Sequence, residues 1–244
     1  MISDEETIDS FAADGIPEIP LQWIDTDKNE HTRESDRKAG KKHDIEHKSR
    51  MVVCGQLERC DGLRTDSPTG DVDAHNLVFS WCASNKVHVK SADISSAYLQ
   101  GKQNDRVILY RIPKGGIPEE GVQEGDVIAA RVPIYGTKDA GRGFWLRLKE
   151  VVTDKGYNLN RILPTMFTMI DNSKIVGVMS SNVDDLLYGS LPGYEKAMDE
   201  ILDTFSVRER NSAPFSILWQ GSRARRELQY HGHRERQYRE DSPD

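Results

Sequence analysis

Residues 174–189, which read KIVGVMSSNVDDLLYG, constrain the fold of this chain more than any other stretch. Two apolar runs, 175–179 and 186–188, flank a polar segment that contains Asp184 and Asp185, a pattern typical of a hairpin with two carboxylates near its turn. Neighbouring side chains in a regular strand point to opposite faces, so the two carboxylates converge readily only in a turn. Convergence is costly unless a proton or a cation relieves the repulsion, and a divalent metal ion is the natural candidate. The alternative is a solvated pair of aspartates at a hairpin tip.

A third carboxylate, Asp93, follows the short strand-like run 87–89. Carboxylates at the ends of separate strands can share two Mg²⁺ ions, which are hard cations that take oxygen ligands and hold substrate phosphates. We therefore expect Asp93, Asp184 and Asp185 to be the catalytic residues and to form one site for Mg²⁺ or Mn²⁺.

Three motifs occur in order along the chain: SADISSAYLQG at 91–101, IYGTKDAGRGFW at 134–145 and SNVDDLLYG at 181–189. Their order and spacing resemble those of the reverse transcriptases of copia-type LTR retrotransposons, over about residues 48–208 with weaker traces from Ile19. The resemblance implies an α+β fold, a right-hand polymerase with fingers and an antiparallel palm sheet that carries the three aspartates. It also implies an RNA-directed DNA polymerase, a nucleotidyltransferase that adds deoxyribonucleoside triphosphates to a primer on an RNA or DNA template.

The resemblance also suggests nucleotide-binding residues. Lys48 and Arg50 lie in a basic run similar to the fingers strand that contacts the incoming triphosphate, although such a run is often a solvated face. Tyr98 takes the place of the ring that collides with a ribose 2′-hydroxyl, the alternative being an aromatic core residue. Asp139 and Arg142 lie in the block that shapes the nucleotide pocket and contacts the template, and Arg142 could meet phosphate.

Three positions depart from the family pattern. Asp139 replaces a glutamine and cannot donate the amide hydrogen bond, and Gly141 replaces a proline. Asn182 replaces the aromatic residue that packs near the primer end, which predicts weaker primer binding.

The chain divides by composition into an acidic, disordered segment at 1–30, a fingers-like region at 31–90, a palm region at 91–208 and an aberrant basic tail at 209–244. Apolar spacing predicts helices over 71–85, in the segment that begins near Tyr135, and after Gly193.

The 3 cysteines show no zinc spacing, and no signal peptide or membrane span is recognisable, which favours the cytoplasm or nucleus over secretion. A net charge of −7 predicts that any basic groove is local.

Residues 222–240 are rich in Arg, His, Glu and Gln where the family has strands that grip the primer. A shift of reading frame near 218–221 would restore a family-like sequence, so the tail is interpreted as the product of a decaying element. A disordered basic tail and an RNA-binding arm are the alternatives. The RNase H and integrase regions expected in a full-length polyprotein are not recognised.

Three functional classes follow. The main hypothesis is a reverse transcriptase fragment that extends primers poorly, because its primer is not held. The second is a catalytically inactive remnant that acts at most as a nucleic-acid-binding module. A two-metal nuclease would also use clustered aspartates, but it does not explain Tyr98 or the block at 134–145.

Overall fold

The computed structural model describes residues 5–59, 62–103 and 106–213, and the chain forms two compact units. The first unit combines Met1–Ser67 with Ala97–Leu148, and the second combines Pro68–Ser96 with Lys149–Asp244. The fold is mixed α and β, and most strand pairs are antiparallel. Each unit draws on separate stretches of sequence, so the division differs from the consecutive regions 31–90 and 91–208 predicted above. The tail interpreted as frameshifted lies outside the described residues from 214 onward.

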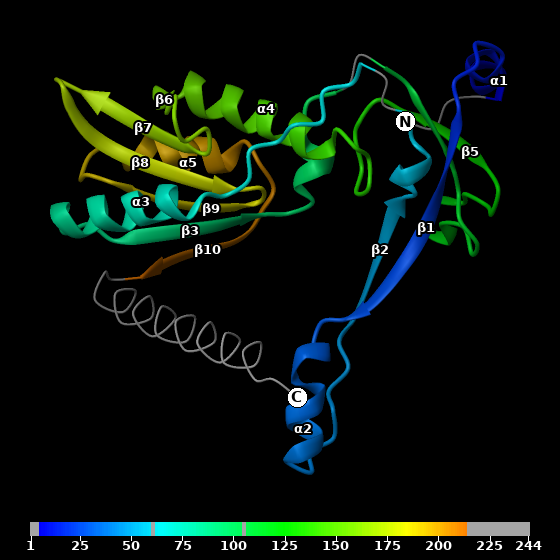
Figure 1. The fold of residues 1–244 in the computed structure, drawn as a ribbon, viewed down its shortest axis with the longest axis horizontal. Coiled ribbons are helices and arrows are strands. Elements are labelled where there is room, and N and C mark those ends of the chain that lie inside the picture. Colours follow the sequence, from blue (N-terminus) through cyan, green and yellow to red (C-terminus); the bar gives the residue numbers. More distant parts are fainter. Residues whose placement is uncertain (1–4, 60–61, 104–105, 214–244) are drawn as a thin grey trace, which may run out of the picture. The chain divides into compact units, whose positions relative to one another are not determined.

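The first unit contains a four-stranded sheet in the order β2-β1-β4-β5 (Figure 1). Only β1 and β4 pair in parallel among these strands. Its elements are α1 (Glu5–Ala13), β1 (Glu18–Asp27), α2 (Arg33–Lys38), β2 (His47–Val53), β4 (Ile108–Arg111), β5 (Val127–Ala130) and the first part of α4 (Ala140–Asp154). The structure corrects the prediction of a disordered segment at 1–30, because alternate apolar residues at the start of β1, Ile19 and Leu21, are buried in the core of this unit.

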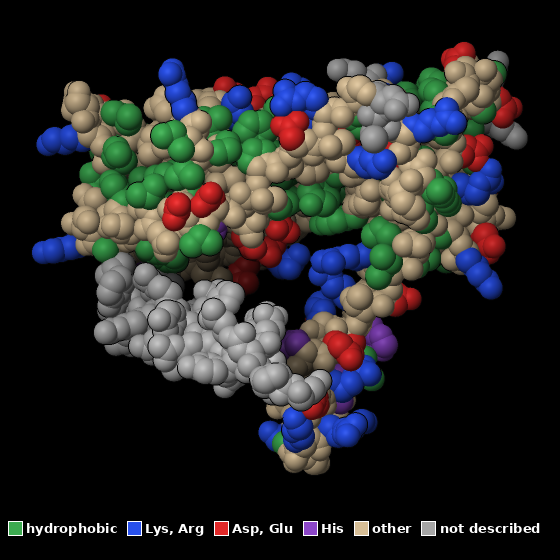
Figure 2. All heavy atoms as spheres, in the orientation of Figure 1, with side chains coloured by type: hydrophobic (Ala, Val, Ile, Leu, Met, Phe, Trp, Pro, Cys, Tyr) green, Lys and Arg blue, Asp and Glu red, His purple; other side chains and the backbone are tan. Residues whose placement is uncertain are grey.

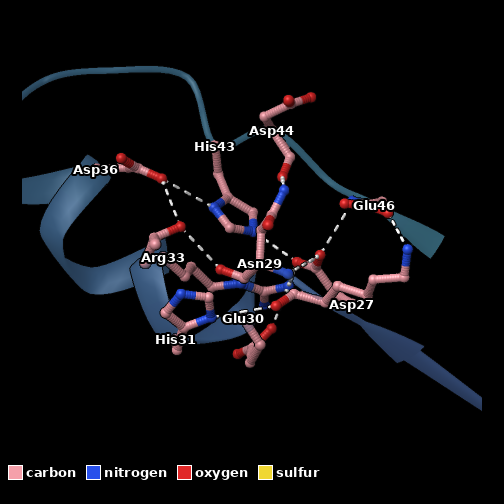
Figure 3. Close-up of polar contacts among 11 residues, drawn as sticks. Asp27, Asn29, Glu30, His31, Arg33, Asp36, His43, Asp44 and Glu46 are labelled. Carbon is pink, nitrogen blue, oxygen red and sulfur yellow. Dashed lines mark hydrogen bonds and ion pairs between the residues drawn. The ribbon is translucent and has the colours of Figure 1, made fainter. Parts of the chain in front are cut away.

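A polar cluster around His43 lies where β1 ends and β2 begins (Figure 3). Its Nε2 atom lies 2.5 Å from Oδ2 of Asp27, and its Nδ1 atom lies 3.2 Å from Oδ2 of Asp36. Asp27 also accepts hydrogen bonds from the backbone N–H groups of Asn29 and Glu46. The adjoining helix α2 buries no residue, so polar contacts rather than a hydrophobic core organise this tip.

Both ring nitrogens of His43 face carboxylates, so the doubly protonated ring is the favoured form. Hydrogen bonds to Asp27 and Asp36 raise the pKa of His43 above its ordinary value of 6.5, against the opposing effects of burial and Arg33. The stabilisation is complete below pH 6.5 and is lost as pH rises through the raised pKa. We expect NMR titration of His43 to give a midpoint above 6.5 and to coincide with loosening of residues 27–46.

His43→Gln provides the control for this pH dependence. The variant should show no pH-dependent loosening of the tip across the same range, because the titrating ring is gone. Identical pH profiles in the two proteins would contradict the assignment.

The second unit contains a six-stranded antiparallel sheet in the order β10-β3-β9-β8-β7-β6 (Figure 1). Its elements are α3 (Val72–Asn85), β3 (Val89–Ile94), the end of α4, β6 (Tyr157–Leu159), β7 (Met166–Asp171), β8 (Lys174–Asn182), β9 (Asp185–Ser190), α5 (Glu195–Asp203) and β10 (Val207–Ala213). Helix α3 starts at an Asp71 cap, whose side chain accepts the N–H of Asp73 at 2.7 Å. The helices predicted over 71–85, near Tyr135 and after Gly193 are confirmed as α3, α4 and α5.

Helices α3 and α5 lie against opposite faces of this sheet (Figure 1). Ala74, Val78 and Cys82 of α3 are fully buried, and burial raises the pKa of the Cys82 thiol to about 11. A Cβ at Gly189 of β9 would overlap the Cys82 sulfur, so the missing side chain lets helix and sheet pack closely. No helix among the described residues is long and apolar enough to cross a membrane.

Candidate active site

The predicted hairpin is formed by β8 and β9. Asn182 pairs with Asp185, which leaves Val183 and Asp184 as a two-residue turn. Val183 has a φ of +55°, a left-handed conformation that is unfavourable for a β-branched residue. The carbonyl of Asp184 accepts the backbone N–H of Ile94 at 2.9 Å, so the turn is tied to the end of β3.

The strand register brings two of the three predicted aspartates together. Asp93 of β3 lies directly opposite Asp185 of β9, and Glu209 of β10 lies opposite Asp93 on its other side. Directly opposite residues of antiparallel strands point to the same face of a sheet. Glu209, Asp93, Asp185 and Asn182 therefore form one polar row across four strands, which we call the acidic row. It borders a cavity of about 300 Å³ that His75 also lines.

The electrostatics of the acidic row favour a cation. Burial and the neighbouring charges of Asp184 and Asp93 raise the pKa of the Asp185 carboxyl. One oxygen of Asp93, Oδ1, is buried without a hydrogen-bond partner. These features suit a divalent cation with oxygen ligands. In the described part of the chain, however, no group of three His, Cys, Asp or Glu side chains is gathered closely enough to hold a metal ion as it stands.

Asn182 connects the hairpin to the start of α3. Its Oδ1 atom accepts the backbone N–H of Gly70 at 3.1 Å. A Cβ at Gly70 would lie 2.5 Å from the Cβ of Asn182, so this approach needs glycine at position 70. The side chain that takes the place of the family's aromatic residue thus has a specific contact of its own.

In the first unit, Arg50 and Tyr98 both contact the ring of Tyr135. The Tyr98 and Tyr135 rings have centroids 4.9 Å apart, and the guanidinium carbon of Arg50 lies 5.7 Å from the Tyr135 centroid. Lys48 is on the same strand as Arg50, two residues earlier. Two of the predicted nucleotide-binding residues therefore share one aromatic cluster, and Tyr98 is only partly buried in it.

Asp139 and Arg142 each have a polar partner of their own in the first unit. Asp139 is 5% exposed and accepts a hydrogen bond from Nη2 of Arg106 at 3.0 Å. Arg142 donates from Nη1 to Oδ2 of Asp66 at 2.8 Å. Both residues line a cavity of about 480 Å³ with Arg64, Lys102 and Arg106. A role for either residue in nucleotide binding remains a prediction, because both are engaged with protein groups.

The charges of the described residues are mixed in sign. On the face shown in Figure 2, Lys and Arg side chains are interspersed with Asp and Glu side chains. This pattern agrees with the net charge of −7 and limits basic recognition to local groups.

Several site residues were missed by sequence reasoning. Glu209 and Arg208, whose Nη1 atom lies 3.6 Å from Oδ2 of Asp93, were missed because the register of β10 against β3 cannot be read from local pattern. His75 was missed because nothing in the sequence of α3 predicts that it lines the same cavity as Asp93 and Asp185. Tyr135 lay inside the motif at 134–145, and its aromatic side chain was the only available signal.

Comparisons with known proteins show the family of this chain. The family model described as reverse transcriptase (RNA-dependent DNA polymerase) matches residues 13–204, and the chain belongs to this family. The chain is 25% identical over 175 residues to the retrovirus-related Pol polyprotein from transposon RE1 of Arabidopsis thaliana, an alignment that covers 70% of this chain and 12% of that protein.

It is also 24% identical over 155 residues to the truncated transposon Ty1-A Gag-Pol polyprotein of Saccharomyces cerevisiae, which covers 59% of this chain and 12% of the relative. The chain therefore spans about 12% of the length of these curated relatives. The resemblance to retrotransposon reverse transcriptases is confirmed.

Proposed function

We propose that this chain is the palm and fingers part of a retrotransposon reverse transcriptase, an RNA-directed DNA polymerase that extends a primer with deoxyribonucleotides. The second unit would supply the palm and the first unit the fingers. One observation carries the proposal: Asp93 lies directly opposite Asp185, and Asp184 occupies the adjoining turn. Nucleotidyl transfer requires a compact set of carboxylates at such a point.

Asp93, Asp184 and Asp185 would hold Mg²⁺ or Mn²⁺, the divalent ions that reverse transcriptases generally use. When bound, such ions stabilise charge on the transferring phosphoryl group and activate the primer hydroxyl. The buried Oδ1 of Asp93, which has no hydrogen-bond partner, and the pKa of Asp185, raised by burial and by neighbouring carboxylates, support this role, because a bound dication would relieve both.

The first unit would bind the deoxyribonucleoside triphosphate. Arg50 and Lys48 would meet phosphate, Tyr98 would exclude a ribose 2′-hydroxyl, and Arg142 would contact phosphate after release from Asp66. Arg50 is exposed and Tyr98 is partly buried, which supports contact with a ligand. The nucleic-acid partner would be a primed RNA or DNA template, within a polyprotein that also supplies RNase H and integrase.

A second candidate is an inactive polymerase-like remnant that binds nucleic acid at most. It is favoured by Asn182, whose amide is occupied by Gly70 in place of an aromatic contact near the primer end. Positioning of reacting groups can account for roughly 7–11 kcal/mol of a barrier, so poor primer placement could abolish synthesis despite intact carboxylates.

Primer extension on an RNA template with Mg²⁺ or Mn²⁺ tests the proposal. We expect weak extension by the unaltered chain and none by Asp184→Asn. Asp203→Asn is the matched control, because Asp203 pairs with Arg210 on the surface of the same unit. Extension that survives in Asp184→Asn would contradict the assigned site, and no extension by any variant would favour the inactive remnant.

A further inference from the structure

Besides the three aspartates, Arg208 affects the binding of cations at the acidic row. In the pairing of β10 with β3, Val207 lies opposite Ile94 but Glu209 lies opposite Asp93. Arg208 is therefore an extra residue without a partner in the ladder. Such a bulge redirects side chains at the point where it occurs.

The bulge brings the Arg208 side chain to the acidic row. Its Nη1 atom lies 3.6 Å from Oδ2 of Asp93. A guanidinium does not lose its proton in proteins, so it can leave the carboxylates only by moving.

The contact is one that a competing cation can replace. A separation of 3.6 Å is too long for a good hydrogen bond, and the Arg208 side chain is 60% exposed. An exposed ion pair of this kind contributes little to stability, so displacement into water costs little. A dication would gain from several carboxylate oxygens that a single guanidinium cannot neutralise.

We propose that Arg208 is a built-in counter-cation of the acidic row and that divalent metal ions bind by displacing it. Arg208 is thus a positioning residue that sets the metal affinity of the site. This inference rests on the proposed function, because it requires the aspartates to be the metal ligands.

Mn²⁺ binding to the full chain at low ionic strength, followed by the EPR signal of free Mn²⁺, provides the test. Arg208→Gln should tighten Mn²⁺ binding by up to about fivefold, because the ion no longer has to displace an exposed ion pair, whose strength sets the limit of the gain. The gain should shrink at high salt, where exposed charges are screened. Arg210→Gln is the matched control: it removes the same charge from the same strand, but from a residue that pairs with Asp203.

Arg210→Gln should leave Mn²⁺ affinity within about twofold of the unaltered chain, because Arg210 follows Glu209 in β10, so that its side chain points to the other face of the sheet and pairs there with Asp203. Equal affinities for Arg208→Gln and the unaltered chain, or equal gains for both arginine variants, would overturn the inference. Asp185→Asn distinguishes a failure of the counter-cation role from a failure of the proposed metal site. If Asp185→Asn weakens binding while Arg208→Gln changes nothing, only the counter-cation role fails. If Asp185→Asn binds Mn²⁺ as the unaltered chain does, the proposed metal site itself fails.

Discussion

Replacement of Glu58 by alanine is expected to destabilise the first unit by about 2–4 kcal/mol, because it removes charge-assisted hydrogen bonds and leaves a backbone donor unsatisfied. The Glu58 side chain is 1% exposed and pairs with Arg106. It also accepts the backbone N–H of Lys138 at 2.8 Å, and its own carbonyl accepts from Lys138 Nζ at 2.8 Å. Without the Glu58 carboxylate, Arg106 keeps its ion pair with Asp139, but the backbone N–H of Lys138 loses its acceptor.

Glu18→Ala is the matched control for Glu58→Ala. Glu18 pairs with Arg111 in the same unit, but both side chains are considerably more exposed than Glu58. Surface pairs contribute about 0–1 kcal/mol, so this variant should remain close to the unaltered chain. Urea unfolding combined with hydrogen exchange of first-unit peptides measures both variants. Similar losses from the two substitutions would show that the buried network contributes no more to the free energy of unfolding than the surface pair does.

Gly136→Ala should be comparably severe, with a loss of roughly 2–6 kcal/mol from backbone strain and overpacking together. Gly136 has a φ of +92°, which side chains other than glycine rarely adopt. An added Cβ would overlap the carbonyl oxygen of Val53 and lie 2.9 Å from its nitrogen. The neighbouring carbonyl of Tyr135 accepts the Val53 N–H at 2.7 Å, so movement of this segment would also displace the ring that contacts Tyr98 and Arg50.

Gly143→Ala distinguishes this steric effect from a general intolerance of alanine. Gly143 lies in α4, and its added Cβ would meet only the side chain of Pro133 at 3.3 Å and the carbonyl of Lys102 at 3.4 Å. Alanine also favours helix over glycine by about 1 kcal/mol, which offsets part of the crowding. We expect a small change in urea midpoint for Gly143→Ala and a large decrease for Gly136→Ala. A small change for both would contradict the close packing against Val53.

Much of the second unit's local structure follows from its sequence. Helix α5 was predicted from the spacing of Met198, Ile201 and Leu202, all of which are buried. Helix α3 was predicted in the same way, yet its Val72 and Leu77 are exposed at 75% and 46%. Apolar periodicity identifies a helix because it depends on neighbours within two turns, but which side of the helix is covered depends on the sheet beneath it.

The prediction of disorder for 1–30 failed for a related reason. The acidic composition of this segment indicates disorder, but burial of Ile19 and Leu21 is enough to anchor β1 in the first unit's core. The parallel neighbour β4 lies far along the chain, and local composition contains no information about such a partner.

The sequence by itself determined the hairpin at 174–189 and three of the helices, because short-range periodicity carries that information, and the order of the motifs singled out the three aspartates as candidates. Tertiary structure alone decided that Glu209 and Asp185 flank Asp93, that Arg208 approaches Asp93, and that Asn182 contacts Gly70. These relations depend on strand register, and a shift of one residue would turn every side chain of a strand to the other face. Register is set by the summed packing of the whole sheet, which no single stretch of sequence contains.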